Sequence, residues 1–192
     1  MIKCRVLNKD ALYDYKWACK LTQGIKLEPV EVNRPKSETA YWVRQIIANH
    51  STLRFVHFVF EADAPKSVVM QIIRATKGNP QPEVESSRPD WTGKERSSDP
   101  YEEKIFGQLH TAESFTAMAR QRLCNKTEPR TKAFMFELVQ TLLNSEDPFL
   151  RAVGLCCKPS CWWHGGCCPE PKCCNENIPS LSDKIFMEEE NG

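Results

Sequence analysis

A group of polar side chains in the middle and last third of the chain has the chemistry to bind an anion. Its members are Gln71, Arg74, Ser86, Ser87, Arg88 and Arg122. Gln71 and Arg74 are three residues apart, so they project from the same face of the helix expected there. Arginine binds phosphate and carboxylate groups through two parallel hydrogen bonds. If these side chains converge, the pocket suits a nucleotide; the alternative is that each arginine is a solvated surface charge.

The second chemical feature is a cluster of cysteines near the end of the chain. Seven of the ten cysteines lie between Cys156 and Cys174. Four thiolates at short spacings can hold zinc tetrahedrally. The candidate ligands are Cys157, Cys161, Cys167 or Cys168, and Cys173 or Cys174, with His164 as an alternate. The other interpretation is a set of free thiols, buried or partly exposed.

The elements that must position these residues follow from hydrophobic periodicity and from helix and turn signals. Helices are expected over 9–21, 37–49, 65–76, 111–126 and 128–145, with a short one opened by Pro148, and a strand over 52–63. Residues 78–100 are rich in Pro, Ser, Gly and charge, which predicts a long loop of the kind that is often functional. We expect an α+β fold with a small antiparallel sheet carried by helices.

Composition narrows the class of protein. A length of 192 residues fits one domain with a small appendage, which we place at 1–150 with a cysteine-rich tail over 151–192. A net charge of +1 argues against non-specific nucleic-acid binding, which needs excess positive charge. The start of the chain has no apolar signal region, and its apolar runs are too short to cross a bilayer. We therefore expect a cytoplasmic protein with no membrane contact and reduced thiols.

The order of motifs resembles that of flavin-dependent thymidylate synthases. That family has a histidine-led turn, a strand, a helix with a glutamine one turn before an R-H-R triplet, and a loop ending in S-x-R-Y. The matching segments here are His50-Ser51-Thr52, FVHFVFEAD, Gln71-Ile72-Ile73-Arg74 and Ser86-Ser87-Arg88.

Three further segments extend the resemblance over most of the chain. WACKLT is similar to the family's A-A-R-x-S turn and places Thr22 at a flavin-contacting position. SFTAMARQRLCNKTEPR is similar to the helix that carries a nucleotide-binding arginine, here Arg122. The ending PSCWWHGGCCPEPKCC looks like the P-x-C…G-x-C-x-E…C ending of many members.

The resemblance implies a fold, a reaction and a site. The fold would be that of the flavin-dependent thymidylate synthases, and the reaction the methylation of dUMP to dTMP, with reduced FAD supplying hydride, methylenetetrahydrofolate the carbon, and NADPH the reducing power. Gln71, Arg74, Ser86, Ser87, Arg88 and Arg122 would hold dUMP, with Ser86 and Arg122 in catalytic roles. Thr22, His50, Thr52 and Arg74 would contact FAD. Family members are homotetramers whose active sites form between subunits.

The chain also departs from the family pattern. Ala75 and Thr76 replace the histidine and second arginine of the R-H-R triplet, and Pro89 replaces the tyrosine after S-x-R. Most of the long helical segment before the C-terminal helices is missing. Two alternatives follow: an enzyme with altered pyrimidine chemistry such as hydroxymethylation, or a non-catalytic protein that binds a nucleotide or is a metal-stabilised structural protein.

Overall fold

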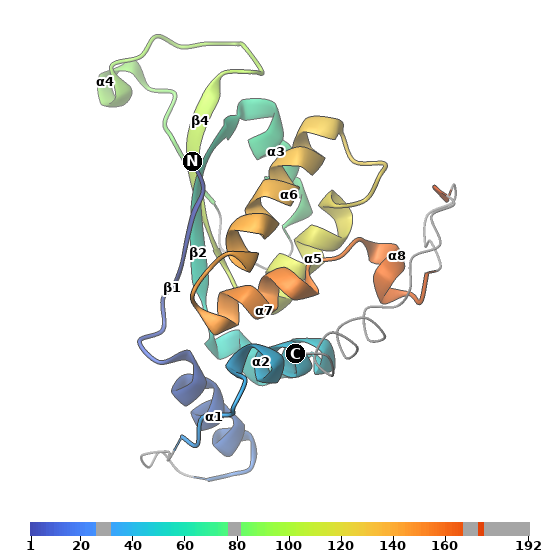
Figure 1. Ribbon diagram of the computed structural model, residues 1–192. Helices are drawn as coiled ribbons and strands as arrows, with labels where there is room; N and C mark the ends of the chain where they lie inside the picture. Colours follow the sequence, from blue (N-terminus) through green and yellow to red (C-terminus); the bar gives the residue numbers. More distant parts are fainter. Residues whose placement is uncertain (26–31, 77–81, 167–172, 175–192) are drawn as a thin grey trace.

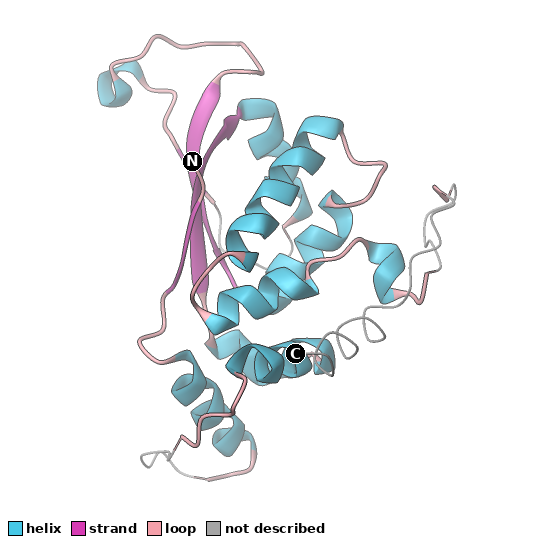
Figure 2. Cartoon of the chain, viewed as in Figure 1, coloured by secondary structure: helices cyan, strands magenta, loops and turns pink. Residues whose placement is uncertain are grey.

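The computed structural model describes residues 1–25, 32–76, 82–166 and 173–174, and these form an α+β fold (Figure 1). A four-stranded antiparallel sheet forms one layer, and helices pack against one of its faces (Figure 2). The elements, in chain order, are β1 (Lys3–Val6), α1 (Ala11–Thr22), α2 (Glu38–Ala48), the 3-10 helix η1 (Ser51–Phe55), β2 (Phe58–Pro65), α3 (Lys66–Ala75), β3 (Glu83–Val84), α4 (Pro89–Thr92), β4 (Glu103–His110), α5 (Ala112–Arg122), α6 (Pro129–Leu143), α7 (Pro148–Cys156) and α8 (Ser160–Trp163).

The main helices begin where a polar side chain accepts hydrogen bonds from the first backbone N–H groups. Asp10 caps α1 and Ser37 caps α2. Thr111 caps α5 by accepting from the Ser114 N–H, and its own N–H donates to Oγ of Ser114. Asp147 accepts from the N–H groups of Phe149 and Leu150 at the start of α7. Such caps satisfy N–H groups that have no partner within the helix, and so fix where each helix starts.

The sheet has the strand order β1-β2-β4-β3, with every neighbouring pair antiparallel. The two central strands are eight residues long, whereas β1 and β3 at the edges have four and two. Side chains alternate along β2 and β4 between buried and more exposed positions. This period of two identifies one face that packs on the helices and one that does not.

The core lies between the sheet and the helices. Phe58, Phe60 and Phe106 of the sheet are buried, and Phe58 meets Phe115 of α5 edge to face at 5.3 Å between ring centroids. Trp42 of α2 contacts Phe149 of α7 in the same manner at 5.1 Å. These aromatic contacts join helices distant in sequence into one hydrophobic cluster.

The α+β class with a small antiparallel sheet is confirmed, and the helices expected from periodicity are present with shifted ends. The strand expected over 52–63 is wrong in its first part, because residues 51–55 form η1 and the strand starts at Phe58. Leu53 donates its N–H to the carbonyl of His50, and the side chains of Leu53 and Val56 are buried. The 3-10 turn therefore buries these apolar side chains without forming a strand.

Two strands, β1 and β4, were not expected, and the segment expected to be a loop contains β3 and α4 in its described part. The boundary expected at position 150 falls inside α7. Buried residues of the core continue along this helix and include Cys157, the residue after its end. Over the described ranges, no helix is long and apolar enough to cross a membrane.

Candidate functional site

Three of the expected anion-binding residues meet where the C-terminal half of α3 packs against the end of α5. Arg122 donates from Nη2 to the backbone carbonyl of Gln71 at 2.5 Å. Arg74, one turn further along α3, is close enough for its charge to act on Arg122. We call Gln71, Arg74 and Arg122 the α3–α5 arginine cluster.

The electrostatics of the arginine cluster favour an anion. Burial, and secondarily the positive charge of Arg74, lower the pKa of the Arg122 guanidinium. In the described part of the chain neither arginine forms an ion pair with a carboxylate, and the buried Nε of Arg122 has no hydrogen-bond partner. Two like charges held together without a counter-charge repel each other, so a bound anion would relieve the repulsion.

Three of the four residues expected to contact flavin lie together in a hollow between α1, α2 and η1. Thr22 ends α1, while His50 and Thr52 lie at the start of η1, and all three line a cavity of about 560 Å³. This volume is within the usual range for ligand pockets. The fourth residue, Arg74, belongs to the arginine cluster instead.

A polar network forms the wall of this α1–α2–η1 hollow. Tyr15 donates its hydroxyl proton to Oε1 of Gln45 at 2.7 Å, and the Cys19 thiol lies 3.5 Å from Oγ1 of Thr52. Burial raises the pKa of the Tyr15 phenol, which keeps it neutral. Lys16 and Lys20 add positive charge at the rim, and Lys16 donates to the carbonyl of Asn33. Hydroxyl, ammonium and aromatic groups together suit a phosphate-bearing ligand with a flat ring.

The remaining expected residues, Ser86, Ser87 and Arg88, lie away from the arginine cluster in this single chain. They follow β3 on an arm that extends past the end of the sheet to α4 (Figure 1). Arg88 pairs with Asp90 at 2.5 Å and lies over the ring of Trp91 at 4.5 Å, and its N–H donates to Oγ of Ser86. Arg88 is therefore occupied by contacts within the arm.

The hollow and the arginine cluster lie near opposite ends of α5. At its first turn, Glu113 pairs with Arg54 of η1, and η1 also lines the hollow. At its last turn, Arg122 reaches Gln71. The 11 residues of α5 span about 16 Å at 1.5 Å per residue. A ligand in the hollow and an anion at the cluster would therefore lie about one helix length apart along α5.

Comparison with protein-family models and with curated proteins finds no match. The assignment of these two places therefore depends on the geometry above and on the sequence resemblance.

The cysteine cluster is only partly within the described residues. Cys157 and Cys161 are buried and Cys173 is exposed, while Cys167 and Cys168 lie outside the described ranges. Within those ranges, no three cysteine, histidine or acidic side chains are grouped so that they could hold a metal ion. Burial raises the pKa of Cys156 to about 12 and raises the pKa of Cys157 well above its ordinary value, so both thiols are protonated.

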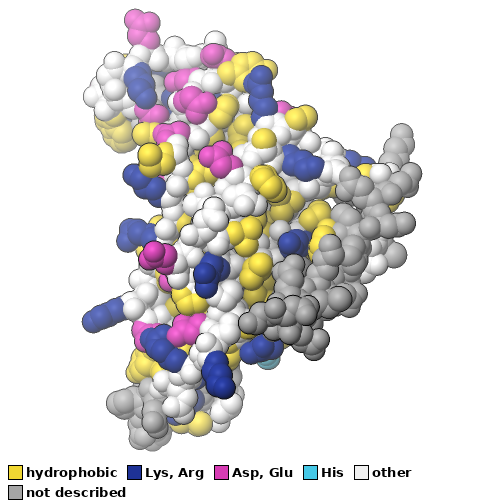
Figure 3. All heavy atoms as spheres, viewed as in Figure 1, with side chains coloured by type: hydrophobic (Ala, Val, Ile, Leu, Met, Phe, Trp, Pro, Cys, Tyr) yellow, Lys and Arg dark blue, Asp and Glu magenta, His cyan; other side chains and the backbone are white. Residues whose placement is uncertain are grey.

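The residues that the sequence prediction missed are mainly the cationic ones of the hollow. Lys16 and Lys20 are four residues apart on α1, a spacing that places them on one helix face. The sequence therefore placed these two lysines on one helix face, but only the fold shows that this face borders η1 and α2. Charges are otherwise mixed over the face of the molecule drawn in Figure 3, where basic and acidic side chains alternate.

Proposed function

We propose that the chain binds a pyrimidine nucleoside monophosphate at the α3–α5 arginine cluster and acts as an enzyme of the flavin-dependent thymidylate synthase type, with the fold of that family, converting dUMP to dTMP. The single observation that carries the proposal is the pairing of Arg74 and Arg122 beside Gln71, without a carboxylate partner in the described chain. These are the residues to which the resemblance gives the nucleotide.

The roles of the cluster follow from its chemistry. Arg122 is held in place through the Gln71 carbonyl and would stabilise negative charge that develops on the uracil ring during the reaction. Arg74 is exposed beside it and free to reach a phosphate or a flavin. A guanidinium preoriented by a backbone hydrogen bond loses little freedom when substrate binds, which strengthens its effect on the transition state.

Ser86 and Arg88 enter the same site from a neighbouring subunit in this proposal. The arm that carries them extends away from its own chain's cluster (Figure 1). In the family, active sites form between subunits, and a homotetramer would allow the arm of one subunit to reach the cluster of another. Substrate phosphate would then replace Asp90 as the partner of Arg88.

The donor set of the α1–α2–η1 hollow fits FAD. Thr22, His50 and Thr52 would supply hydrogen bonds, Lys16 and Lys20 would attract the negative pyrophosphate, and Tyr15 and Tyr41 would give flat apolar surface. When bound and reduced by NADPH, the flavin supplies hydride, and methylenetetrahydrofolate supplies the one-carbon unit. The chain's own contribution is to bind, to orient and to keep Tyr15 neutral. A structural zinc ion in the cysteine tail is proposed separately, on the short spacings of its cysteines.

The test of the nucleotide site is the affinity for dUMP, measured by titration calorimetry on the full-length protein. We expect Arg122→Ala to weaken binding about 10- to 100-fold, as expected for loss of one charge-assisted hydrogen bond. Arg151→Ala is the matched control, since Arg151 is exposed on α7 and makes only a 3.4 Å contact to Thr39. Equal dUMP affinity in both variants, or no affinity in the wild type, would refute the site.

The test of the reaction is dUMP-dependent oxidation of reduced flavin, with dTMP as the product. A protein that carries no flavin after purification in the presence of FAD, and forms no dTMP, contradicts the enzyme assignment but leaves the nucleotide site standing. This separation matters because the two parts of the proposal depend on different residues.

One observation favours a second candidate, a nucleotide-binding protein with altered or lost chemistry. Ala75 is buried, and the Thr76 hydroxyl donates to the Ile72 carbonyl and accepts from Gln108. The positions where the family has a histidine and an arginine are therefore used here for packing. Incubation with dUMP, dCMP and the folate distinguishes the candidates, since dTMP as the sole product excludes the second.

A further inference from the structure

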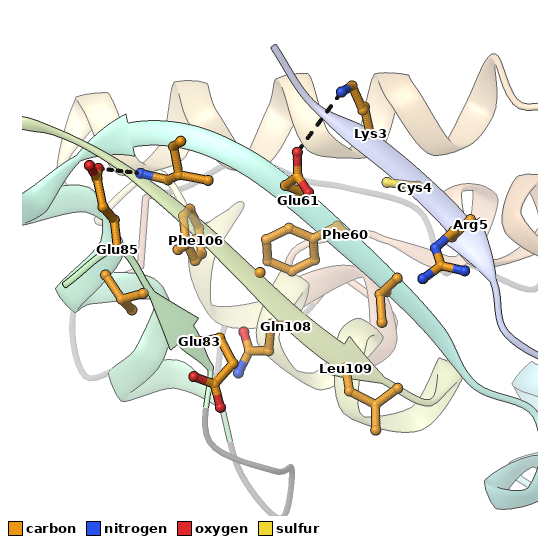
Figure 4. A pocket seen from close by; sticks show the side chains of 14 residues that line it. Lys3, Cys4, Arg5, Phe60, Glu61, Glu83, Glu85, Phe106, Gln108 and Leu109 are labelled. Atoms are coloured by element: carbon orange, nitrogen blue, oxygen red, sulfur yellow. Dashed lines mark hydrogen bonds and ion pairs between the residues drawn. The ribbon is translucent and has the colours of Figure 1, made fainter. Parts of the chain in front are cut away.

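One face of the sheet is bare in the part of the chain that the structure describes. The helices pack on the opposite face (Figure 1), and a hollow of about 940 Å³ lies over the bare face, lined by residues of all four strands (Figure 4). Val59 of β2 and Leu109 of β4 are paired on this face near one end of the hollow, and Ile105, half exposed, lies four residues before Leu109 on the other side of Gly107. A bare sheet face with apolar residues on its two central strands is typical of an interaction surface.

Charge on this face is ordered from one edge to the other. Lys3 and Arg5 make the β1 edge basic, and Lys3 has only a long, exposed ion pair with Glu61 at 3.9 Å. Glu83 makes the β3 edge acidic, whereas Glu85, just after β3, is already paired with Lys94 at 2.6 Å. Lys3, Glu61, Gly107 and Glu83 form a single row across the four strands, because the register pairs each with the next. In that row Gly107 has no side chain, which leaves a gap two strands from Lys3.

This order makes the face complementary to itself. A two-fold axis parallel to the strands places β1 of one copy over β3 of the other and keeps each row at the same level. Lys3 then faces Glu83 of the second copy, Glu61 faces the gap at Gly107, and Val59 faces Leu109. An axis perpendicular to the strands would instead place β1 over β1 and β3 over β3, so like charges would meet. Isologous interfaces require this kind of self-complementarity.

The size of the patch sets the strength of the contact. A patch four strands wide and eight residues long covers at most about 500 Å² per copy, or about 1,000 Å² in total. That area is at the lower end for specific interfaces, so the contact is weak and reversible. Because ion pairs form at both edges of this contact, added salt weakens the association further.

We propose that this sheet face is a homodimer interface, in which two copies pack face to face with the basic β1 edge of each over the acidic β3 edge of the other. The occupant is a second copy and not an unrelated partner, because the face already carries both halves of the charge pattern. This inference does not use the nucleotide site and is independent of the proposed function. Sheets packed in this way lie about 10 Å apart, with a crossing angle of about 30°.

Two charge reversals in one row test the arrangement. Lys3→Glu places an acidic side chain at both ends of the row from Lys3 to Glu83, and Glu83→Lys places a basic side chain at both ends. Each variant alone would place like charges opposite each other at two symmetric positions, so we expect its dimer dissociation constant to rise at least tenfold. Sedimentation equilibrium of the full chain over a wide concentration range measures this constant. If the wild type forms a larger assembly through additional interfaces, each variant should lose the association that this face provides, and the measured mass of the assembly should fall accordingly.

Mixing the two variants, Lys3→Glu with Glu83→Lys, is the decisive experiment. In the mixed dimer the row of one copy is acidic at both ends, and the row of the other copy is basic at both ends. Opposite charges therefore meet again at both symmetric positions, and association is restored at low salt. Glu137→Lys, on the exposed side of α6, is the control and leaves the constant unchanged.

Three results would overturn the proposal: a wild type that stays monomeric, a reversal that leaves the constant unchanged, or a mixture that fails to associate.

Discussion

His110 makes the stability of the fold depend on pH in a way that one substitution isolates. Its ring is fully buried at the end of β4, stacked with Phe58 and Phe60 and edge to face with Phe115, with Nδ1 3.2 Å from Oγ of Ser114. Burial lowers the pKa of His110 to about 3. The folded chain therefore keeps this ring neutral, while the unfolded chain protonates it near the ordinary histidine pKa of about 6.5.

The sign and size of the effect follow by proton linkage. Below pH 6.5 the unfolded state binds a proton that the folded state does not, so the free energy of unfolding falls as the pH falls from about 6.5 towards 3. The slope approaches about 1.4 kcal/mol per pH unit, so the loss at pH 5 relative to pH 7 is about 2 kcal/mol. Acidic groups with lowered pKa, such as Glu128, lose their contribution only at lower pH.

Urea denaturation at pH 7 and pH 5, followed by circular dichroism, measures this loss. His110→Gln keeps a hydrogen-bonding partner for Ser114 but cannot be protonated, so its stability should change little between the two pH values, although it starts lower because ring stacking is lost. His50→Gln, at an exposed position, should retain the wild-type loss. If wild type and His110→Gln lose the same free energy of unfolding, the reasoning fails.

Three further predictions concern packing, capping and surface charge, and each is checked by the urea midpoint. A Cβ at Gly154 would lie 3.1 Å from the side chain and backbone N of Leu143, so Gly154→Val should push α7 off α6 and destabilise by about 2 kcal/mol; an unchanged midpoint would contradict this packing. Asp147→Ala removes the acceptor for two N–H groups of α7 and should cost about 1 kcal/mol, whereas Asp147→Ser should restore most of it. Arg54→Ala should leave the midpoint unchanged, because its ion pair with Glu113 is exposed; a clear drop would show that this pair fixes η1 to α5.

Local signals in the sequence determined the helices and the fold class. Ser37, Thr111 and Pro148 marked helix starts that the structure confirms to within a residue, because capping and proline geometry act over a few neighbouring residues. The α+β class followed from the alternation of these helices with an apolar extended segment. Strands β1 and β4 escaped prediction, since a strand is stabilised by a neighbour that the sequence does not identify.

Within the candidate site, sequence spacing placed Gln71 and Arg74 on one helix face, which is a local property of α3. Only the tertiary structure brought Arg122, about fifty residues later, against the Gln71 carbonyl, and only it separated Arg88 from them on the arm. The same holds for the hollow, where Thr22 and Thr52 meet because α1 packs on η1. Contacts between distant segments depend on which apolar faces are buried together, and that choice is made by the whole core and not by any single motif.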